Sequence, residues 1–302
     1  MSKKQKETLI NQALRTVVGF EQIDNKLCRS VKLNSLSEST YKNYIRAIAK
    51  VSIHFNKTPL ALSLEQIEDY LLLQKEAWEP SESYFKHTVY GLRYLFRLYD
   101  RKADSLKLPI IQRSKKLPVV LSLNECKRLF RAPKSIKHRV LYSLIYSAGL
   151  RLKEATNLRK SDLDFERMTI HIRQSKNNKD RYVILSTLIA KGILKYYNEI
   201  NPKIWVFNGK SKGSQLSTSA VQWSLRSARK KAGLEDKRPT VHTLRHCYAT
   251  HALEMGMDIE SLRKNLGHTS IQTTMLYLNI ANLSPKHSFS PFDKLYDLDK
   301  DE

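Results

Sequence analysis

Several strongly polar side chains stand in segments that otherwise look buried. The segment AGLRLKEATNL carries an arginine and a glutamate directly after an apolar run. HTLRH places a histidine and an arginine about one turn apart, on one face of an apolar helix. LGHTSIQTTMLY carries a histidine and a tyrosine, and RQSKNNKDR carries a lysine in a polar turn. The residues concerned are Arg151, Glu154, Lys176, His242, Arg245, His268 and Tyr277. Each alone has an ordinary structural explanation, but together they predict a polar site.

The residue types in this set suit chemistry on a phosphate. Arginine presents a rigid fork of N–H donors that matches two phosphate oxygens. The composition of the whole chain also indicates a partner that carries negative charge. Its 53 Lys+Arg against 29 Asp+Glu give a formal net charge of +24. Such an excess destabilises a compact protein by self-repulsion, which favours a polyanionic partner. Nucleic acid is the first candidate.

The ordered set resembles the tyrosine recombinases, also called the phage integrase family. AGLRLKEATNL is similar to the family's first arginine box. HTLRHCYATHALEMGMDIESLRKNLGHTSIQTTMLY is similar to its second box, continuous through to the nucleophile. The catalytic resemblance covers roughly residues 119–285. It implies a helical core-binding domain followed by a mixed catalytic domain.

The resemblance implies a role for each polar residue. Arg151 and Arg245 are the expected phosphate clamp, and His268 is a further donor to the same oxygens. Attack on a phosphodiester adds a second negative charge, which fixed positive donors stabilise. Tyr277 is the expected nucleophile, forming a covalent 3′-phosphotyrosine and releasing a 5′-hydroxyl. Because the covalent bond conserves the energy of the ester, no ATP is expected. A metal ion is not expected either, which agrees with the missing carboxylate cluster.

Three assignments within this set are less settled. His242 either helps to deprotonate the tyrosine or bonds the phosphate, and Glu154 orients Arg151 or a neighbouring group. Lys176 is expected to protonate the leaving deoxyribose oxygen as a general acid. The family usually has glycine beside this lysine, whereas here asparagines follow it, and Lys179 is a rival. We expect His246 to be structural.

Composition limits the other possibilities. The three cysteines, Cys28, Cys126 and Cys247, lie far apart and form no disulfide framework, which favours a reducing, cytoplasmic setting. No Cys/His cluster has the spacing of a zinc site. No apolar run approaches the ~20 residues of a spanning helix, and the first residues lack the apolar block of a secretory signal. We therefore expect no metal, no cofactor and no membrane partner.

The pattern of apolar residues predicts the elements that hold these side chains. Helical periodicity over 39–55, from about 63 and over 81–99 indicates a small helical domain. After it, alternation on both sides of the Asn177-Asn178 turn predicts a β-hairpin among further helices. The predicted fold class is mainly α with a small antiparallel sheet, in two domains. The predicted divisions are a basic N-terminal arm (1–30), a helical core-binding domain (31–106), a linker (107–118), a catalytic domain (119–285) and a C-terminal tail (286–302).

The function predicted from these features is that of a site-specific DNA recombinase or integrase. The resemblance implies a homo-tetramer on two double-stranded DNA sites, with the segment after Tyr277 docking on a neighbouring protomer. One alternative is a relaxing topoisomerase that uses the same tyrosine chemistry. The other is a non-catalytic DNA-binding or architectural protein, which the intact set of catalytic residue types argues against.

Overall fold

The chain divides into two compact units, unit 1 (1–114) and unit 2 (115–302), and each is described separately. The structure is a computed structural model that describes residues 7–76, 82–111, 117–175, 179–211 and 213–281. The division at 114/115 falls inside the predicted linker, 107–118. The proposed general acid Lys176, the hairpin tip and the predicted C-terminal tail lie outside the described residues.

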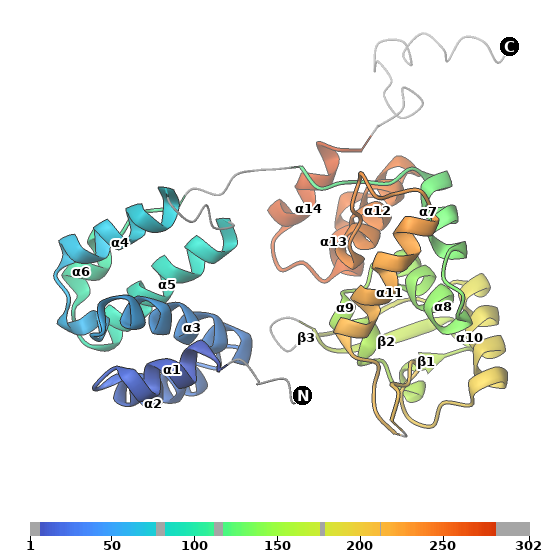
Figure 1. Cartoon of the computed structure of the whole chain (residues 1–302). Coiled ribbons are helices and arrows are strands. Elements are labelled where there is room, and N and C mark those ends of the chain that lie inside the picture. Colours follow the sequence, from blue (N-terminus) through green and yellow to red (C-terminus); the bar gives the residue numbers. More distant parts are fainter. Residues whose placement is uncertain (1–6, 77–81, 112–116, 176–178, 212, 282–302) are drawn as a thin grey trace, which may run out of the picture. The chain divides into compact units, whose positions relative to one another are not determined.

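All of the secondary-structure elements in the described residues of unit 1 are helices (Figure 1). Two apolar clusters stabilise it, and both draw residues from α3 and α5. These two helices approach closely, since a Cβ added at Gly91 would lie 3.3 Å from the Cα of Tyr44. The helices are α1 (Leu9–Thr16), α2 (Phe20–Leu33), α3 (Glu38–Phe55), η1 (Pro59–Ala61), α4 (Leu64–Glu76), α5 (Glu82–Leu98) and α6 (Lys102–Lys107).

The N-terminal segment differs from the separate arm predicted over 1–30. Thr8 caps α1 by accepting a hydrogen bond from the backbone of Asn11. Phe20 and Leu27 of α2 are fully buried, in a cluster that also contains Ile45 of α3. The basic side chains that suggested an arm occupy the outer faces of two amphipathic helices, and the inner faces belong to the core of unit 1.

The first part of the predicted linker also belongs to unit 1. Leu108 is buried there, and Ile111 packs against the same cluster. Arg93 of α5 donates hydrogen bonds to the carbonyls of Leu108 (2.9 Å) and Pro109 (3.2 Å). An arginine fork bonded to these carbonyls fixes the segment although its sequence has no periodic pattern.

Unit 2 combines helices with one three-stranded antiparallel sheet, in the order β1-β2-β3 (Figure 1). The predicted hairpin is present, and Ile170 of β2 pairs with Val183 of β3. The predicted fold class, mainly helical with a small antiparallel sheet, is therefore confirmed. The elements are α7 (Leu123–Arg131), α8 (Ile136–Ser147), α9 (Leu152–Thr156), η2 (Lys160–Asp162), β1 (Leu163–Asp164), β2 (Thr169–Ser175), β3 (Lys179–Ile184), α10 (Thr187–Ile200), α11 (Thr218–Lys231), α12 (Val241–Glu254), α13 (Ile259–Leu266) and α14 (Ile271–Leu278).

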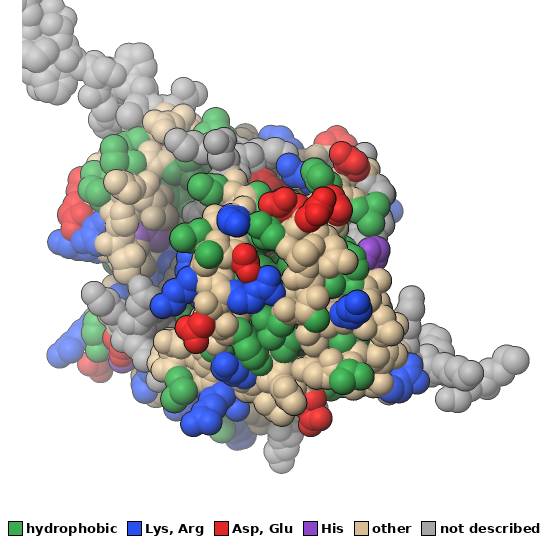
Figure 2. All heavy atoms as spheres, turned by 90° about the vertical axis from the view of Figure 1, so that its left-hand side faces the viewer, with side chains coloured by type: hydrophobic (Ala, Val, Ile, Leu, Met, Phe, Trp, Pro, Cys, Tyr) green, Lys and Arg blue, Asp and Glu red, His purple; other side chains and the backbone are tan. Residues whose placement is uncertain are grey.

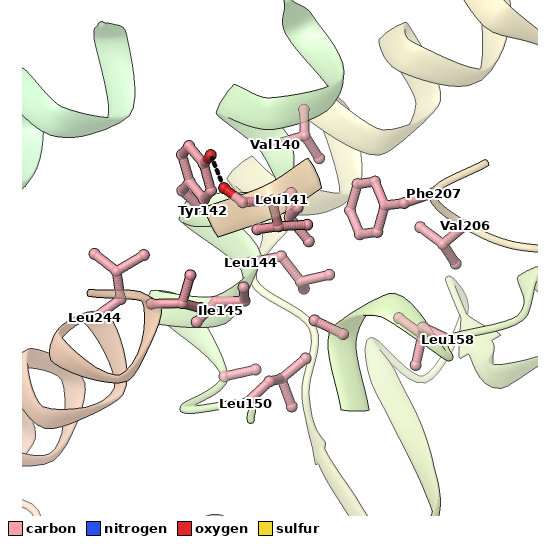
Figure 3. Packing of buried hydrophobic residues seen from close by; sticks show 14 of the residues in the cluster. Val140, Leu141, Tyr142, Leu144, Ile145, Leu150, Leu158, Val206, Phe207 and Leu244 are labelled. Carbon is pink, nitrogen blue, oxygen red and sulfur yellow. Dashed lines mark hydrogen bonds between the residues drawn. The ribbon is translucent and has the colours of Figure 1, made fainter. Parts of the chain in front are cut away.

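Helix α8 lies at the centre of the main core of unit 2 (Figure 3). Leu141, Leu144 and Ile145 are fully buried, and Leu244 of α12 belongs to the same cluster. The buried hydroxyl of Tyr142 donates to the carbonyl of Val221 at 3.1 Å, so this polar group is satisfied inside the core. This packing fixes α12, which carries the HTLRH segment.

A second cluster of unit 2 joins α12, α13 and α14. Its buried members include Ala249 of α12, Leu262 and Leu266 of α13, and Tyr277 of α14. The tyrosine expected to be the nucleophile is therefore anchored by packing against the helix that carries Arg245. Among the helices of the described residues, none is long and apolar enough to cross a membrane.

Candidate active site

Arg151 is placed by a tight turn between α8 and α9. Gly149 has a φ of +60°, and a Cβ added there would lie 2.5 and 2.6 Å from two ring carbons of Tyr248. Leu150 is buried behind the turn, and Arg151 follows it as the N-cap residue of α9. Its backbone N–H donates to the carboxylate of Glu154 at 2.8 Å, which closes the first turn of the helix.

Glu154 connects two arginines through a buried carboxylate. Its Oε1 accepts from Arg151 Nη1 at 2.8 Å and from Arg181 Nη1 at 3.0 Å. Its Oε2 accepts from Arg181 Nη2 at 2.8 Å. Burial would raise the pKa of this carboxyl, but the bonds and charge of Arg181, together with the bonds from Arg151, lower the pKa to about 2. Glu154 is therefore a fixed negative charge, consistent with its predicted role of orienting Arg151.

Arg245 is buried on α12, with 3% of the residue exposed. Its Nη1 donates to the carbonyl of Gly149, and its Nη2 to the carbonyl of Leu266, each at 2.6 Å. Burial and the charge of Arg151 lower its pKa to about 10, against the opposing charge of Glu154. The group stays cationic at neutral pH. Backbone carbonyls on both sides fix its direction.

His268 bonds Arg245 directly. Arg245 Nη2 lies 3.0 Å from Nε2 of His268, and because arginine can only donate, Nε2 is the acceptor. The other ring nitrogen, Nδ1, then carries the proton and donates to Thr274 Oγ1 at 3.0 Å. Burial, followed by the charges of Arg245 and Arg151, lowers the pKa of His268 to about 4. The free protein therefore holds a neutral imidazole here.

Tyr277 lies against two histidines. Its ring stacks on that of His268, with centroids 6.5 Å apart and planes 10° apart. Its hydroxyl lies 2.9 Å from Nδ1 of His246. Burial raises the pKa of Tyr277, and the charges of Arg245 and Arg151 oppose that rise. The phenol is therefore neutral in the free protein and has an imidazole nitrogen at hydrogen-bonding distance.

His242 and His246 lie one turn apart on α12, with ring centroids 6.4 Å apart. His242 is the exposed one of the pair. Partial desolvation and the charges of Arg245 and Arg151 lower the pKa of His242. Burial, then the charges of His242 and Arg245, lower that of His246 to about 4. Both imidazoles are thus neutral near pH 7.

Most of the residues singled out from the sequence meet in this one place. Arg151, Glu154, Arg245, His268 and Tyr277 form a continuous chain of contacts. His242 lies on α12 one turn from His246, whereas Lys176 is outside the described residues, and the side chain of its rival Lys179 is not described either.

Two residues of this site were not predicted from the sequence. His246, expected to be structural, hydrogen-bonds the hydroxyl of Tyr277. Arg181 donates hydrogen bonds to the carboxylate of Glu154. A signal for Arg181 exists in the sequence, because it alternates with Val183 and Leu185, whose side chains are buried. An arginine in the inward phase of a strand needs a partner inside the fold.

Across the described residues, no group of three or more His, Cys, Asp or Glu side chains is arranged to hold a metal ion. The charged groups that the site does contain are arginines and one carboxylate. Such a set can bind an anion and stabilise additional negative charge on it. The arrangement therefore fits a site for an anion beside the hydroxyl of Tyr277.

A family model described as the phage integrase family matches residues 119–283, more than half of the chain. The chain belongs to the phage integrase family. Its members are the tyrosine recombinases, and the protein is an enzyme of this class, acting in DNA recombination. The matched segment runs from just before α7 to just beyond α14 and includes every described residue of the site.

Curated relatives extend the similarity over nearly the whole chain. The integrase/recombinase y4qK of Sinorhizobium fredii is 30% identical over 272 residues, which are 89% of this chain and 88% of that protein. The tyrosine recombinase XerA of Thermococcus onnurineus is 35% identical over 199 residues, covering 64% of this chain and 69% of the relative.

Solved structures of recombinases share the fold. XerH recombinase bound to a palindromic difH substrate aligns with a TM-score of 0.69 at 20% identity, over 93% of this chain and 88% of that one. A lambda integrase dimer bound to a COC′ core site aligns with a TM-score of 0.67 at 18% identity, over 88% and 78% of the two chains. The predicted two-domain recombinase architecture is thereby confirmed.

Proposed function

We propose that the protein cuts and rejoins double-stranded DNA at specific sites through a covalent 3′-phosphotyrosyl intermediate. One observation carries the proposal. Arg245 bonds His268, whose ring stacks on Tyr277, so a phosphate-binding cation and a nucleophilic oxygen are held in one packed group. Arg151 joins them through Glu154, which it bonds at 2.8 Å.

In the proposed reaction, the oxygen of Tyr277 forms a bond to phosphorus while the bond from phosphorus to the 5′-oxygen breaks. The attack turns a singly charged phosphodiester into a doubly charged transition state. Arg151 and Arg245 donate to the non-bridging oxygens, where the new charge develops. Because the backbone carbonyls of Gly149 and Leu266 already fix Arg245, little reorganisation is needed during the step.

The proton of Tyr277 needs an acceptor, since burial raises the pKa of the phenol. His246 meets the geometric requirement, with Nδ1 at 2.9 Å from the hydroxyl, and it is neutral at pH 7. His242 keeps both predicted roles, as a phosphate donor or as part of the path that removes this proton. To donate to a bound phosphate, Nε2 of His268 must carry the proton and give up the hydrogen bond that it accepts from Arg245.

The departing 5′-oxygen needs a proton, and we assign it to Lys176, with Lys179 as the alternative. Lys176 belongs to the segment that joins β2 to β3, and Lys179 is the first residue of β3. Arg181, on the same strand as Lys179, reaches Glu154 beside Arg151, so the hairpin is anchored next to the proposed phosphate site. The energy of the broken ester stays in the tyrosyl ester, so rejoining by reversal requires no ATP. In this proposal the arginines stabilise the charge on the phosphate, and no metal ion takes part.

Double-stranded DNA is the proposed partner of both units. The formal charge of +24 supports this, and Figure 2 shows Lys and Arg side chains dispersed over the face it draws. In unit 1, a hollow of about 240 Å³ is lined by Asn43, Arg46, Ser83, Tyr84 and His87, none of them acidic. We assign core binding to 31–106, together with the helices before it, and catalysis to 119–285.

For exchange between two DNA sites, we propose a homo-tetramer. Each protomer would supply one Tyr277, and the segment beyond it, of which residues 282–302 lie outside the described part, would dock on a neighbour. A cytoplasmic location fits the proposed substrate. These proposals on assembly and location rest on the family resemblance.

The test is covalent trapping on a DNA site from which the cleaved 5′-end can diffuse away. The wild-type protein should give a protein–DNA adduct on a denaturing gel, and Tyr277→Phe should bind the DNA without forming one. Persistent adduct with Tyr277→Phe would assign the nucleophile elsewhere. Binding without any adduct would support an architectural protein, and relaxation of plasmids without exchange between sites would support a topoisomerase.

A further inference from the structure

Arg181 is a buried arginine that the reaction proposed above does not use. It lies on β3 with 10% of its side chain exposed, and both of its terminal nitrogens bond Glu154. Its Nε donates to the carbonyl of Asn265 at 2.9 Å. The bend after α13 also packs on it, since a Cβ added at Gly267 would lie 3.1 Å from Arg181 Cδ. Its direction is therefore fixed from three sides.

The two oxygens of Glu154 are largely occupied by Arg181. Each oxygen accepts one bond from its guanidinium, at 3.0 and 2.8 Å, and each also accepts one from Arg151. Arg245 Nη1 lies 4.0 Å from Oε2, beyond a normal hydrogen bond. Arg181 thus bonds Glu154 with both of its terminal nitrogens.

The charges decide what this arrangement can do. Arg151, Arg181 and Arg245 carry three positive charges against the one of Glu154, so two remain for a substrate. Two charges match the dianionic transition state of attack on a phosphodiester, whereas one would match its singly charged ground state. Without Arg181, Glu154 would have free acceptors, and its nearest cations would be the two arginines that we assign to the phosphate.

We propose that Arg181 is a positioning residue that neutralises Glu154 and thereby keeps Arg151 and Arg245 available for the phosphate. This inference rests on the proposed function. A carboxylate and a phosphate compete for the same arginine fork, because both present oxygens at matching spacing. Arg181 ends that competition by occupying the carboxylate. The carboxylate can then hold Arg151 through one charged bond without drawing Arg245 away.

The experiment measures the rate of adduct formation on ordinary DNA with Arg181→Met. We expect a loss of at least about tenfold, with DNA binding nearly unchanged, because the effect falls on the transition state. Adding Glu154→Gln to Arg181→Met should recover part of the loss, because the competing charge is then removed. A purely structural arginine would give additive losses or a worse double variant.

A second substrate separates positioning from folding. A methylphosphonate at the cleaved position replaces one non-bridging oxygen by a methyl group, so its transition state carries one negative charge fewer. The rate of adduct formation by Arg181→Met is compared with that of wild type on each substrate. The factor by which the substitution lowers this rate should be markedly smaller on methylphosphonate DNA than on ordinary DNA. If Arg181→Met does not fold, Arg181→Lys replaces it, since one ammonium cannot bond both oxygens as the guanidinium fork does.

Arg173→Met is the matched control. Arg173 lies on β2 of the same hairpin, and its Nε donates to the buried Asp162 at 2.6 Å. Its loss breaks a comparable ion pair away from Glu154, so any effect should be equal on both substrates. No adduct with wild type would overturn the proposed function. Two outcomes would overturn this inference alone, given an adduct with wild type. In one, the Arg181 variants cleave as fast as wild type; in the other, their cleavage rates fall by the same factor on both substrates.

Discussion

Arg151 and Arg245 reach one site from different elements, and their surroundings differ. Arg245 is almost fully buried and bonded to two backbone carbonyls, whereas 24% of the Arg151 side chain is exposed. Arg245 remains cationic, since its lowered pKa, about 10, lies above neutral pH. At the scale of single residues, the site is therefore a preset positive field beside a neutral phenol.

Replacing either arginine should therefore affect cleavage far more than binding. We expect Arg151→Ala and Arg245→Ala to lower the rate of adduct formation by at least ~10²-fold, the scale of losing one preorganised donor. DNA affinity should fall much less, because many other basic residues contribute to it. Arg167→Ala, which removes an exposed arginine of the same unit, is the control. Near-normal cleavage by either variant would contradict the proposed clamp.

The neutral histidines predict how stability depends on pH. The pKa of His246 and of His268 is lowered to about 4, whereas an unfolded histidine titrates near 6.5. Between these values the unfolded chain binds more protons, so the free energy of unfolding should decrease as the pH falls from about 6.5 towards 4. Denaturant unfolding in a series of buffers measures this.

The double variant His246→Gln, His268→Gln should show a flatter dependence over the same range. Glu154 acts in a separate window, since its lowered pKa of about 2 contributes stability that is lost only as the pH falls below about 4.5. An unchanged slope in the double variant would show that the two imidazoles are not the groups that titrate.

At the scale of elements, the turn between α8 and α9 determines where Arg151 lies. Gly149→Ala would place a Cβ 2.5 Å from the ring of Tyr248, at a φ of +60°. We expect a loss of about 1–3 kcal/mol in the free energy of unfolding from strain and overpacking, and a reduced cleavage rate from displaced Arg151.

Gly233→Ala is the control for this prediction. Its φ is +66°, but nothing lies within 4 Å of an added Cβ, so it tests the backbone strain without the clash. It should cost less stability and leave cleavage close to wild type. Equal effects of the two substitutions would mean that the contact with Tyr248 does not position Arg151.

Elements with a clear periodic pattern could be predicted from the sequence, and those that depend on distant contacts could not. The helix predicted over 39–55 corresponds to α3, and the alternating segment to β2 and β3. α1 and α2 were not predicted as part of the helical domain because their outer faces are basic. Their apolar faces are recognisable as core only from their packing against α3 and α5. Arg181 was missed because its partner Glu154 lies 27 residues away, on another element.

At the scale of the whole molecule, the excess of 53 Lys+Arg over 29 Asp+Glu is the dominant property. This excess of basic residues favours nucleic acid as the partner. It affects how tightly the protein binds DNA rather than the rate of the chemical step. Phosphate contacts by basic side chains release counterions from DNA, so their number sets how steeply binding falls with salt. The proposed cleavage step instead depends on two arginines of the site, Arg151 and Arg245.

This separation leads to a prediction about salt and metal ions. DNA affinity should fall steeply with salt, and the slope of log K against log [salt] should be unchanged in Tyr277→Phe, which removes no charge. Cleavage at a low salt concentration, with all DNA bound, should persist in EDTA, because the proposed donors are arginines and a histidine. A gel-shift titration at several salt concentrations measures the affinity, and the covalent adduct assay, run with and without EDTA and magnesium, measures cleavage. A strict requirement for magnesium would contradict the tyrosine mechanism, and a weak salt dependence would contradict the assignment of the excess charge to the DNA backbone.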